Sequence, residues 1–168
     1  MTLNQGTELK TALIATLLLG LAAAASASEQ TDCAAAKGAF LTGTVTSAPK
    51  FAAASQTIQG IKLSHTHLSL RADQDGKTYD VAIDNVFATD YVKNASTVPA
   101  SLAAIKVNDR LELCGAKYTS GVGIHWVHTN CGDVPTTSAP NGWVKRFAAG
   151  GTVGSNIERS QTYCYLWN

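Results

Sequence analysis

The residues best suited to chemistry are four histidines, which stand in two short motifs, His65-Thr66-His67 and His125-Trp126-Val127-His128. On a strand, the two rings of a His-x-His motif lie on one face, about 6.6 Å apart along the chain. Neutral imidazoles bind transition metals, and imidazoles exchange protons near neutral pH. The motifs therefore predict a site for a metal, an anion or a proton transfer.

Metal binding is one use of these side chains. Zinc, copper and nickel all accept imidazole nitrogens, with Asp84 as a further candidate ligand. The cysteines contain no Cys-x-x-Cys spacing, so a thiolate zinc site is not expected. A hydrogen-bonded pair of histidines near the rim of a barrel is the alternative. The candidate metal ligands are His65, His67, His125 and His128.

General acid–base chemistry is a second use. In this interpretation His67 and His125 act as acid and base, and His65 or His128 orients them. One His-x-Ser-x run begins at His67 and resembles the motif of histidine phosphoesterases. Those enzymes need two facing copies, and the chain has one.

Aromatic residues suggest a ligand surface. Trp126 and Trp143 are its candidates, and together with Tyr118 and Trp167 they could form a stacking platform. The alternative places these rings in the core. Regular pleating puts His125 on the face opposite Trp126, unless a β-bulge beside the glycines at 121–123 brings the histidines together.

The run Ile124-His125-Trp126-Val127-His128 and the later Gly142-Trp143 resemble a family of small exported bacterial proteins, domain of unknown function 3465. That family is marked by Ile-His-Trp-Thr-His-His-Asp-Pro and a following Gly-Trp. The chain departs from the pattern at Thr129, Asn130 and Cys131, where the family has His-Asp-Pro. The resemblance implies a compact exported domain and no particular activity.

The segments around these motifs alternate apolar and polar residues, which is typical of half-buried strands. An Asp-Gly turn at 75–76 predicts a hairpin, and a short helix is expected near 100–105. The pattern predicts an all-β, mainly antiparallel, five- to six-stranded barrel of the oligonucleotide/oligosaccharide-binding (OB) type with one short helical insert. The expected strands are 41–46, 61–70, 78–84, 111–118, 124–129 and a short piece at 142–145.

Four cysteines behind an export signal predict two disulfides. The preferred pairing is Cys33 with Cys164 and Cys114 with Cys131. The main alternative pairs Cys131 with Cys164. Either arrangement stabilises a small barrel.

Residues 1–27 have the charged start, apolar run and Ala-Ser-Ala end of a signal peptide. An N-terminal segment at 28–40, a β-barrel domain at 41–147 and a glycine-rich connector with a docked tail at 148–168 follow. No later segment has the roughly 18 apolar residues of a membrane span. The sequence predicts a periplasmic or secreted protein.

The formal net charge is +1, and the basic residues are scattered. Nucleic acid is therefore disfavoured as a partner, because its binders carry a clustered basic surface. The sequence predicts a binding or interaction module that holds a small ligand, a protein partner or a transition metal. The alternative is a histidine-dependent hydrolase, metal-assisted or not, that cleaves phosphodiester-type bonds.

Overall fold

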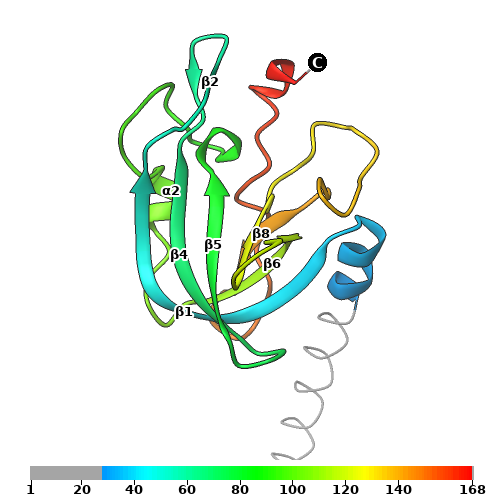
Figure 1. The fold of residues 1–168 in the computed structure, drawn as a ribbon. Helices are drawn as coiled ribbons and strands as arrows, with labels where there is room; N and C mark the ends of the chain where they lie inside the picture. Colours follow the sequence, from blue (N-terminus) through cyan, green and yellow to red (C-terminus); the bar gives the residue numbers. More distant parts are fainter. Residues whose placement is uncertain (1–27, 168) are drawn as a thin grey trace, which may run out of the picture. The chain divides into compact units, whose positions relative to one another are not determined.

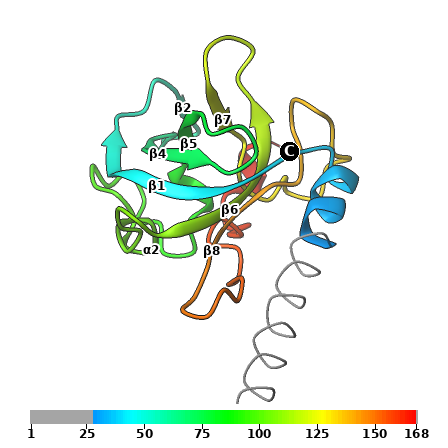
Figure 2. The same ribbon diagram turned by 90° about the horizontal axis from the view of Figure 1, so that it is seen from below.

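The protein folds as a small closed barrel of five strands in the computed structural model, which describes residues 28–167 (Figure 1). The predicted signal peptide at 1–27 lies outside the described residues. Around the ring the order is β1–β4–β5–β7–β6, and β6 pairs back with β1 to close it (Figure 2). The strands are β1 (Ala39–Ala52), β4 (His65–Ala72), β5 (Thr78–Asp84), β6 (Arg110–Lys117) and β7 (Gly123–His125).

The connectivity confirms the OB-like prediction. Three strands follow one another antiparallel, a short helix α2 (Ala100–Ala103) comes next, and a hairpin then places β7 parallel to β5. This arrangement is that of the OB barrel. Strand β8 (Trp143–Arg146) adds to β6 outside the ring. None of the helices within residues 28–167 has the length and apolar character to cross a membrane.

Strand β1 serves two neighbours and must bend to do so. Its first half pairs with β6 and its second half with β4, with irregular register on either side of Ser47. At Gly43, where the two pairings overlap, a Cβ would come within 2.3 Å of the Arg71 carbonyl oxygen. Bulges and glycine at such a bend are the usual means of closing a small barrel.

The alternating apolar residues of the five strands point inward and form the main core. Leu102 of α2 and Ile105 behind it complete this core. A second, smaller cluster lies under the short hairpin of β2 (Thr57–Ile58) and β3 (Ile61–Lys62) and includes η1 (Asn85–Phe87) and η2 (Cys164–Leu166). Fully buried members of the main core include Val45, Leu70, Val81, Leu113 and Ile124.

The predicted strand at 61–70 is two strands, so that prediction is wrong in its continuity. Strand β3 ends at Lys62 and β4 begins at His65. Between them Leu63 and Ser64 are both buried, and the Ser64 hydroxyl accepts a hydrogen bond from Asn85. The apolar residues change phase across this break, from Ile61 and Leu63 to Leu68 and Leu70, and the polar residues 64–67 between them leave its position undefined in the sequence.

The predicted strand at 124–129 is also too long. Strand β7 ends at His125 because Trp126 adopts a left-handed backbone with φ 54°, which a β-ladder does not accommodate. The chain then leaves the sheet, and the amide of Gly142 donates to the carbonyl of His128 at 2.8 Å.

All four cysteines form disulfides, but the preferred pairing is wrong. The bonds are Cys33–Cys114 and Cys131–Cys164, so the alternative partner for Cys131 is the correct one. Because β1 pairs Phe40 with Cys114, the chain just before β1 lies beside that cysteine. Neither relationship can be derived from spacing along the sequence.

Candidate functional site

All four histidines line one cavity of about 640 Å³. His65 and His67 come from β4, and His125 ends β7, with His128 three residues further along. The two motifs are about sixty positions apart in the sequence, yet the barrel brings them together because β5 separates β4 from β7 and pairs with both. In an OB barrel this face, on the second and third strands of the ring, is the usual ligand surface.

Asp84, at the end of β5, joins the two motifs. Its Oδ1 lies 2.8 Å from His65 Nε2, and its Oδ2 lies 3.3 Å from His128 Nε2. One carboxylate thus holds two imidazoles, one from β4 and one from the segment that follows β7. The Asp84 side chain is 22% exposed, so this arrangement lies partly out of water.

The pKa values of this group follow from the contacts. Burial alone would raise the pKa of Asp84, but the hydrogen bonds from His128 and His65 outweigh it and hold that pKa well below its usual range. The same hydrogen bond raises the pKa of His65 against the opposing effect of burial. Asp84 is therefore ionised at neutral pH, and its hydrogen bond shifts His65 toward the charged form relative to a free imidazole.

His128 is the most enclosed of the four, with 3% of its side chain exposed. Its Nδ1 lies 2.6 Å from the Thr129 carbonyl oxygen, so both ring nitrogens face acceptors. Asp84 and the Thr129 carbonyl thus engage both nitrogens of the ring. Phe87 stacks on it with ring centroids 3.7 Å apart and planes 6° apart.

His67 belongs to a second carboxylate. Its Nδ1 lies 3.0 Å from each oxygen of Asp80, and the Tyr118 hydroxyl donates to Asp80 at 2.7 Å. Burial and this contact raise the pKa of Tyr118, so the phenol stays protonated. Nδ1 of His67 is thereby fixed, and its Nε2 remains for a ligand.

The imidazole of His125 has no hydrogen-bond partner among the described residues. It contacts the edge of the Tyr118 ring, with 5.5 Å between the ring centroids. Burial is the largest influence on its pKa, which is lowered. A neutral imidazole without a partner is the cavity's most available base and ligand contact.

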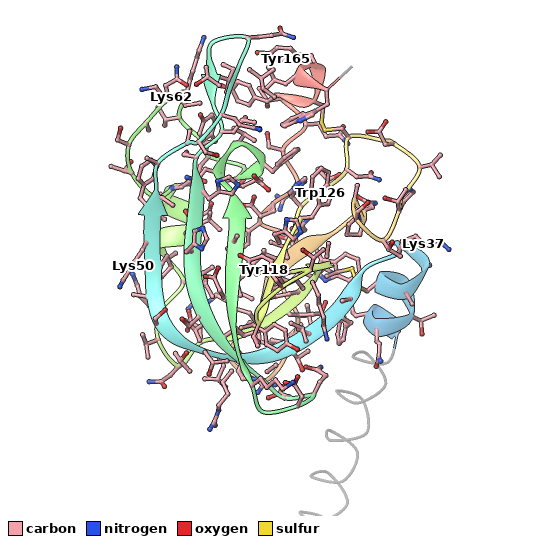
Figure 3. The ribbon with its side chains drawn as sticks, viewed as in Figure 1. Lys37, Lys50, Lys62, Tyr118, Trp126 and Tyr165 are labelled. Carbon is pink, nitrogen blue, oxygen red and sulfur yellow. A yellow bond between two sulfur atoms is a disulfide. The ribbon has the colours of Figure 1, made fainter. Side chains whose placement is uncertain are left out.

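Aromatic rings form the rest of the wall. Trp126 and Trp167 line the cavity, and in Figure 3 Tyr118 and Trp126 are seen beside β5. The indole nitrogen of Trp126 is buried without a hydrogen-bond partner in the described part of the chain. Trp126 is only partly buried, whereas His128 is enclosed.

Trp143, a predicted ligand-surface residue, is not among the residues that line the cavity. It lies on β8, donates its indole N–H to Glu112 at 3.0 Å and packs under Lys145. The aromatic side chains that line the cavity are Phe87, Tyr118, Trp126 and Trp167.

Several residues of the site were not predicted. Asp80 holds His67 but does not itself line the cavity, and it was visible as an alternating polar residue of β5, opposite Ser69 of β4. Phe87 was hidden because it follows the strand in η1. Cys131 and Asp133 reach the cavity through a loop, and no local pattern shows where a loop returns.

The charge of the cavity is low. Its lining includes the carboxylates of Asp84 and Asp133, and none of the described lining residues is lysine or arginine. Within residues 28–167, no three or more His, Cys, Asp or Glu side chains are grouped as a metal ion would require. The four imidazoles are instead arranged around carboxylates and aromatic rings.

No protein-family model and no curated protein sequence matches this chain.

Proposed function

We propose that this protein is a periplasmic or secreted binding module whose cavity holds a small ligand through its histidines. The observation that carries the proposal is the convergence of four histidines, from two distant segments, in one cavity on the usual ligand face of an OB barrel. Small-molecule sites are concave and mostly apolar, with a few placed polar groups. His125 and the free nitrogen of His67 are those groups.

The charges favour a small, weakly charged ligand. Nucleic acid binding depends on lysine and arginine neutralising phosphates, and neither residue type lines the described cavity. A volume of about 640 Å³ falls in the range of ordinary ligand sites. The aromatic side chains of Trp126 and Trp167 would contact a flat or ring-shaped ligand.

Ligand-dependent stabilisation tests the proposal. A compound that binds the folded state at a hundred times its Kd adds about 2.7 kcal/mol to stability, which thermal-shift screening of a small-molecule collection detects. His67→Ala combined with His125→Ala should abolish the shift. Lys77→Ala, at the exposed turn between β4 and β5, is the matched control and should leave the shift unchanged. A shift that survives loss of both histidines would contradict the proposal.

Elemental analysis of the oxidised, exported protein separates a metal from an organic ligand. Near-stoichiometric zinc, copper or nickel, lost in His65→Ala with His67→Ala, would replace the small ligand by a metal. Absence of such a metal in both proteins would leave the organic ligand as the proposal.

A histidine-dependent hydrolase is the second candidate. The observation that favours it is geometric: the unpartnered imidazole of His125 and the His67 ring held by Asp80 line the same cavity. In this mechanism His125 accepts a proton from the attacking water, and His67, held by Asp80, protonates the leaving oxygen. Asp84 orients His65 and His128.

Hydrolysis of bis(p-nitrophenyl) phosphate tests this candidate. Activity that falls at least a hundredfold in both His125→Ala and His67→Ala, with a bell-shaped pH profile, would support it. Equal rates in wild type and variants would reject it. Chelation with EDTA shows whether any activity depends on a metal.

A further inference from the structure

We propose that Cys131–Cys164 is a thiol-exchange site, reached by low-molecular-weight thiols through the cavity, and that its reduction removes one wall of that cavity. The inference rests on the cavity of the proposed function but does not depend on which ligand it holds. Four observations lead to it: the access to each disulfide, the bonding of the C-terminal tail, the stacking of its last ring and the backbone at Cys131.

The two disulfides differ in access. Cys33 and Cys114 are both 0% exposed, with Cys114 inside β6. Cys131 is only partly buried and lines the cavity, and Cys164 is 9% exposed. Exchange requires an attacking thiolate to reach a sulfur. The cavity provides that path to Cys131, and a folded barrel denies it to Cys33 and Cys114.

The disulfide holds the C-terminal tail, defined here as residues 161–167, against the barrel. Backbone hydrogen bonds of the tail are internal, such as Cys164 to Gln161 and Trp167 to Cys164. The last backbone bond to the barrel precedes the tail and joins Ser160 to Phe87 at 2.9 Å. Within the described residues, the tail is therefore attached by one covalent bond and by side-chain packing.

The packing of the tail completes the cavity wall. Trp167 stacks on Phe87 with centroids 5.3 Å apart, and Phe87 stacks in turn on His128. Trp167 remains 40% exposed, so this layer is covered from one side only. Loss of the tail would uncover Phe87 and open a path to His128. Figure 1 shows the tail, in red, at the same end of the barrel as β2.

The backbone at the cross-link favours opening once the bond is cut. Cys131 has φ 60°, a left-handed conformation that costs free energy for a residue with a Cβ. The disulfide and the hydrogen bond from the Asn130 amide to Asn141 hold the loop in this form. Reduction removes the disulfide constraint on Cys131 and leaves the hydrogen bond from the Asn130 amide.

The reaction consumes two thiols. A thiolate attacks Cys131 Sγ, the bond between the two cysteine sulfurs breaks, and Cys164 leaves as a thiolate that takes up a proton. A second thiolate then attacks the mixed disulfide on Cys131. The products are the two cysteine thiols and the oxidised disulfide of the small thiol, so electrons and protons balance.

Differential labelling of the folded protein tests the site. The oxidised protein is incubated with reduced glutathione, trapped with iodoacetamide and mapped by mass spectrometry, while far-UV circular dichroism monitors the barrel. Cys131 and Cys164 should be labelled at least ten times faster than Cys33 and Cys114, with the spectrum unchanged. Labelling of all four at one rate would overturn the proposal.

Diethyl pyrocarbonate tests the opening of the wall without any ligand. Acylation of His128 should rise at least fivefold once Cys131–Cys164 is reduced. Trp167→Ala with the disulfide intact should give a similar rise, because it removes the same ring, and Tyr165→Ala is the matched control that should give none. Unchanged His128 reactivity after reduction would overturn the proposal.

These readouts keep the two proposals distinct. Labelling and acylation need no ligand, so they hold or fail even where no compound stabilises the protein. The glutathione experiment uses the wild-type protein. It therefore tests the thiol-exchange site even if a variant without this disulfide, Cys131→Ser with Cys164→Ser, fails to fold.

Discussion

The rings of Phe87 and His128 lie parallel, with centroids 3.7 Å apart and planes 6° apart. Phe87 belongs to η1, directly after β5, whereas His128 belongs to the segment that leaves β7. The contact fixes the plane of His128, and Asp84 and the Thr129 carbonyl fix its rotation within that plane. The most enclosed histidine of the cavity is thus positioned on three sides, by its neighbour Thr129 and by Asp84 and Phe87 at the end of β5.

Phe87→Ala should destabilise the protein by about 3 to 5 kcal/mol, the usual cost of removing a buried phenylalanine, since this side chain is 3% exposed. Urea unfolding followed by circular dichroism measures the effect. Phe87→Leu keeps much of the volume but removes the stacked ring, so it should recover most of the stability and leave His128 more reactive toward diethyl pyrocarbonate. Equal protection of His128 in Phe87→Leu and wild type would show that the ring is not what shields it.

Asp84→Asn should lower the free energy of unfolding by about 2 to 4 kcal/mol at pH 6, because it leaves two partly buried imidazoles without their shared carboxylate. Asp133→Asn, a carboxylate with no ion pair on the exposed loop, is the matched control and should change stability by less than about 0.5 kcal/mol. Similar losses in the two variants would contradict the role given to Asp84.

The same contacts predict how stability depends on pH. The pKa of Asp84 is lowered on folding, so its contribution is present above its ordinary value of 3.8 and is lost as the pH falls. The pKa of His65 is raised, so its contribution is complete below 6.5 and is lost as the pH rises through the folded value. Asp84→Asn should flatten both slopes in a series of melting curves. Slopes as steep as those of wild type would place the titrating groups elsewhere.

Glu158 gives a pH dependence of its own. It is 0% exposed, both carboxyl oxygens lack a hydrogen-bond partner in the described chain, and burial raises its pKa well above 4.5, with smaller effects of Asp84 and Asp90. Folding therefore favours its protonated form, and stability due to Glu158 declines as the pH rises above 4.5. Glu158→Gln should melt at a higher temperature than wild type at pH 8 and differ less at pH 4. The opposite order would mean that the carboxylate has a stabilising partner.

Gly123→Ala should disturb the cavity from its edge. An added Cβ would come within 2.2 Å of the Tyr118 ring, so that ring must move and its hydrogen bond to Asp80 should weaken. Protection of His67 and His125 against diethyl pyrocarbonate should fall. Gly76→Ala, at a turn where an added Cβ meets nothing within 4 Å, is the control for glycine replacement, and should leave both histidines as they were.

The barrel was predictable because most of its strands carry their own local signal. Residues 78–84 alternate cleanly and are β5 as expected, and the Asp-Gly turn correctly predicted the hairpin with β4. The errors lie where backbone conformation departs from the pattern. Trp126 is a strand-forming residue by type, yet its backbone adopts φ 54°.

The sequence predicted which histidines belong to the site better than it predicted how they are arranged. His65 and His67 share a face because pleating requires it, and their ring centroids are 6.3 Å apart. Asp84 holds one histidine from each motif because β5 lies between β4 and β7. This order of strands is a property of the closed ring. Phe87 and Trp167 depend on tertiary packing and a cross-link.

The break at Trp126 divides the cavity wall into a part built on strands and a part built on a loop. The two parts differ in how strongly folding constrains their sequence. His65, His67 and Asp84 lie on strands whose opposite faces build the core, so substitutions there are constrained by folding. The segment from Trp126 to Asn141 lies between β7 and β8, outside both strands. A disulfide and a few hydrogen bonds hold it in place. Val127 in this segment belongs to the main core, but residues 132–138 are mostly exposed, so insertions and substitutions there can accumulate at little cost to the barrel. Descendants of this fold can therefore acquire new ligands by rewriting that one loop while keeping the histidines of β4 in place.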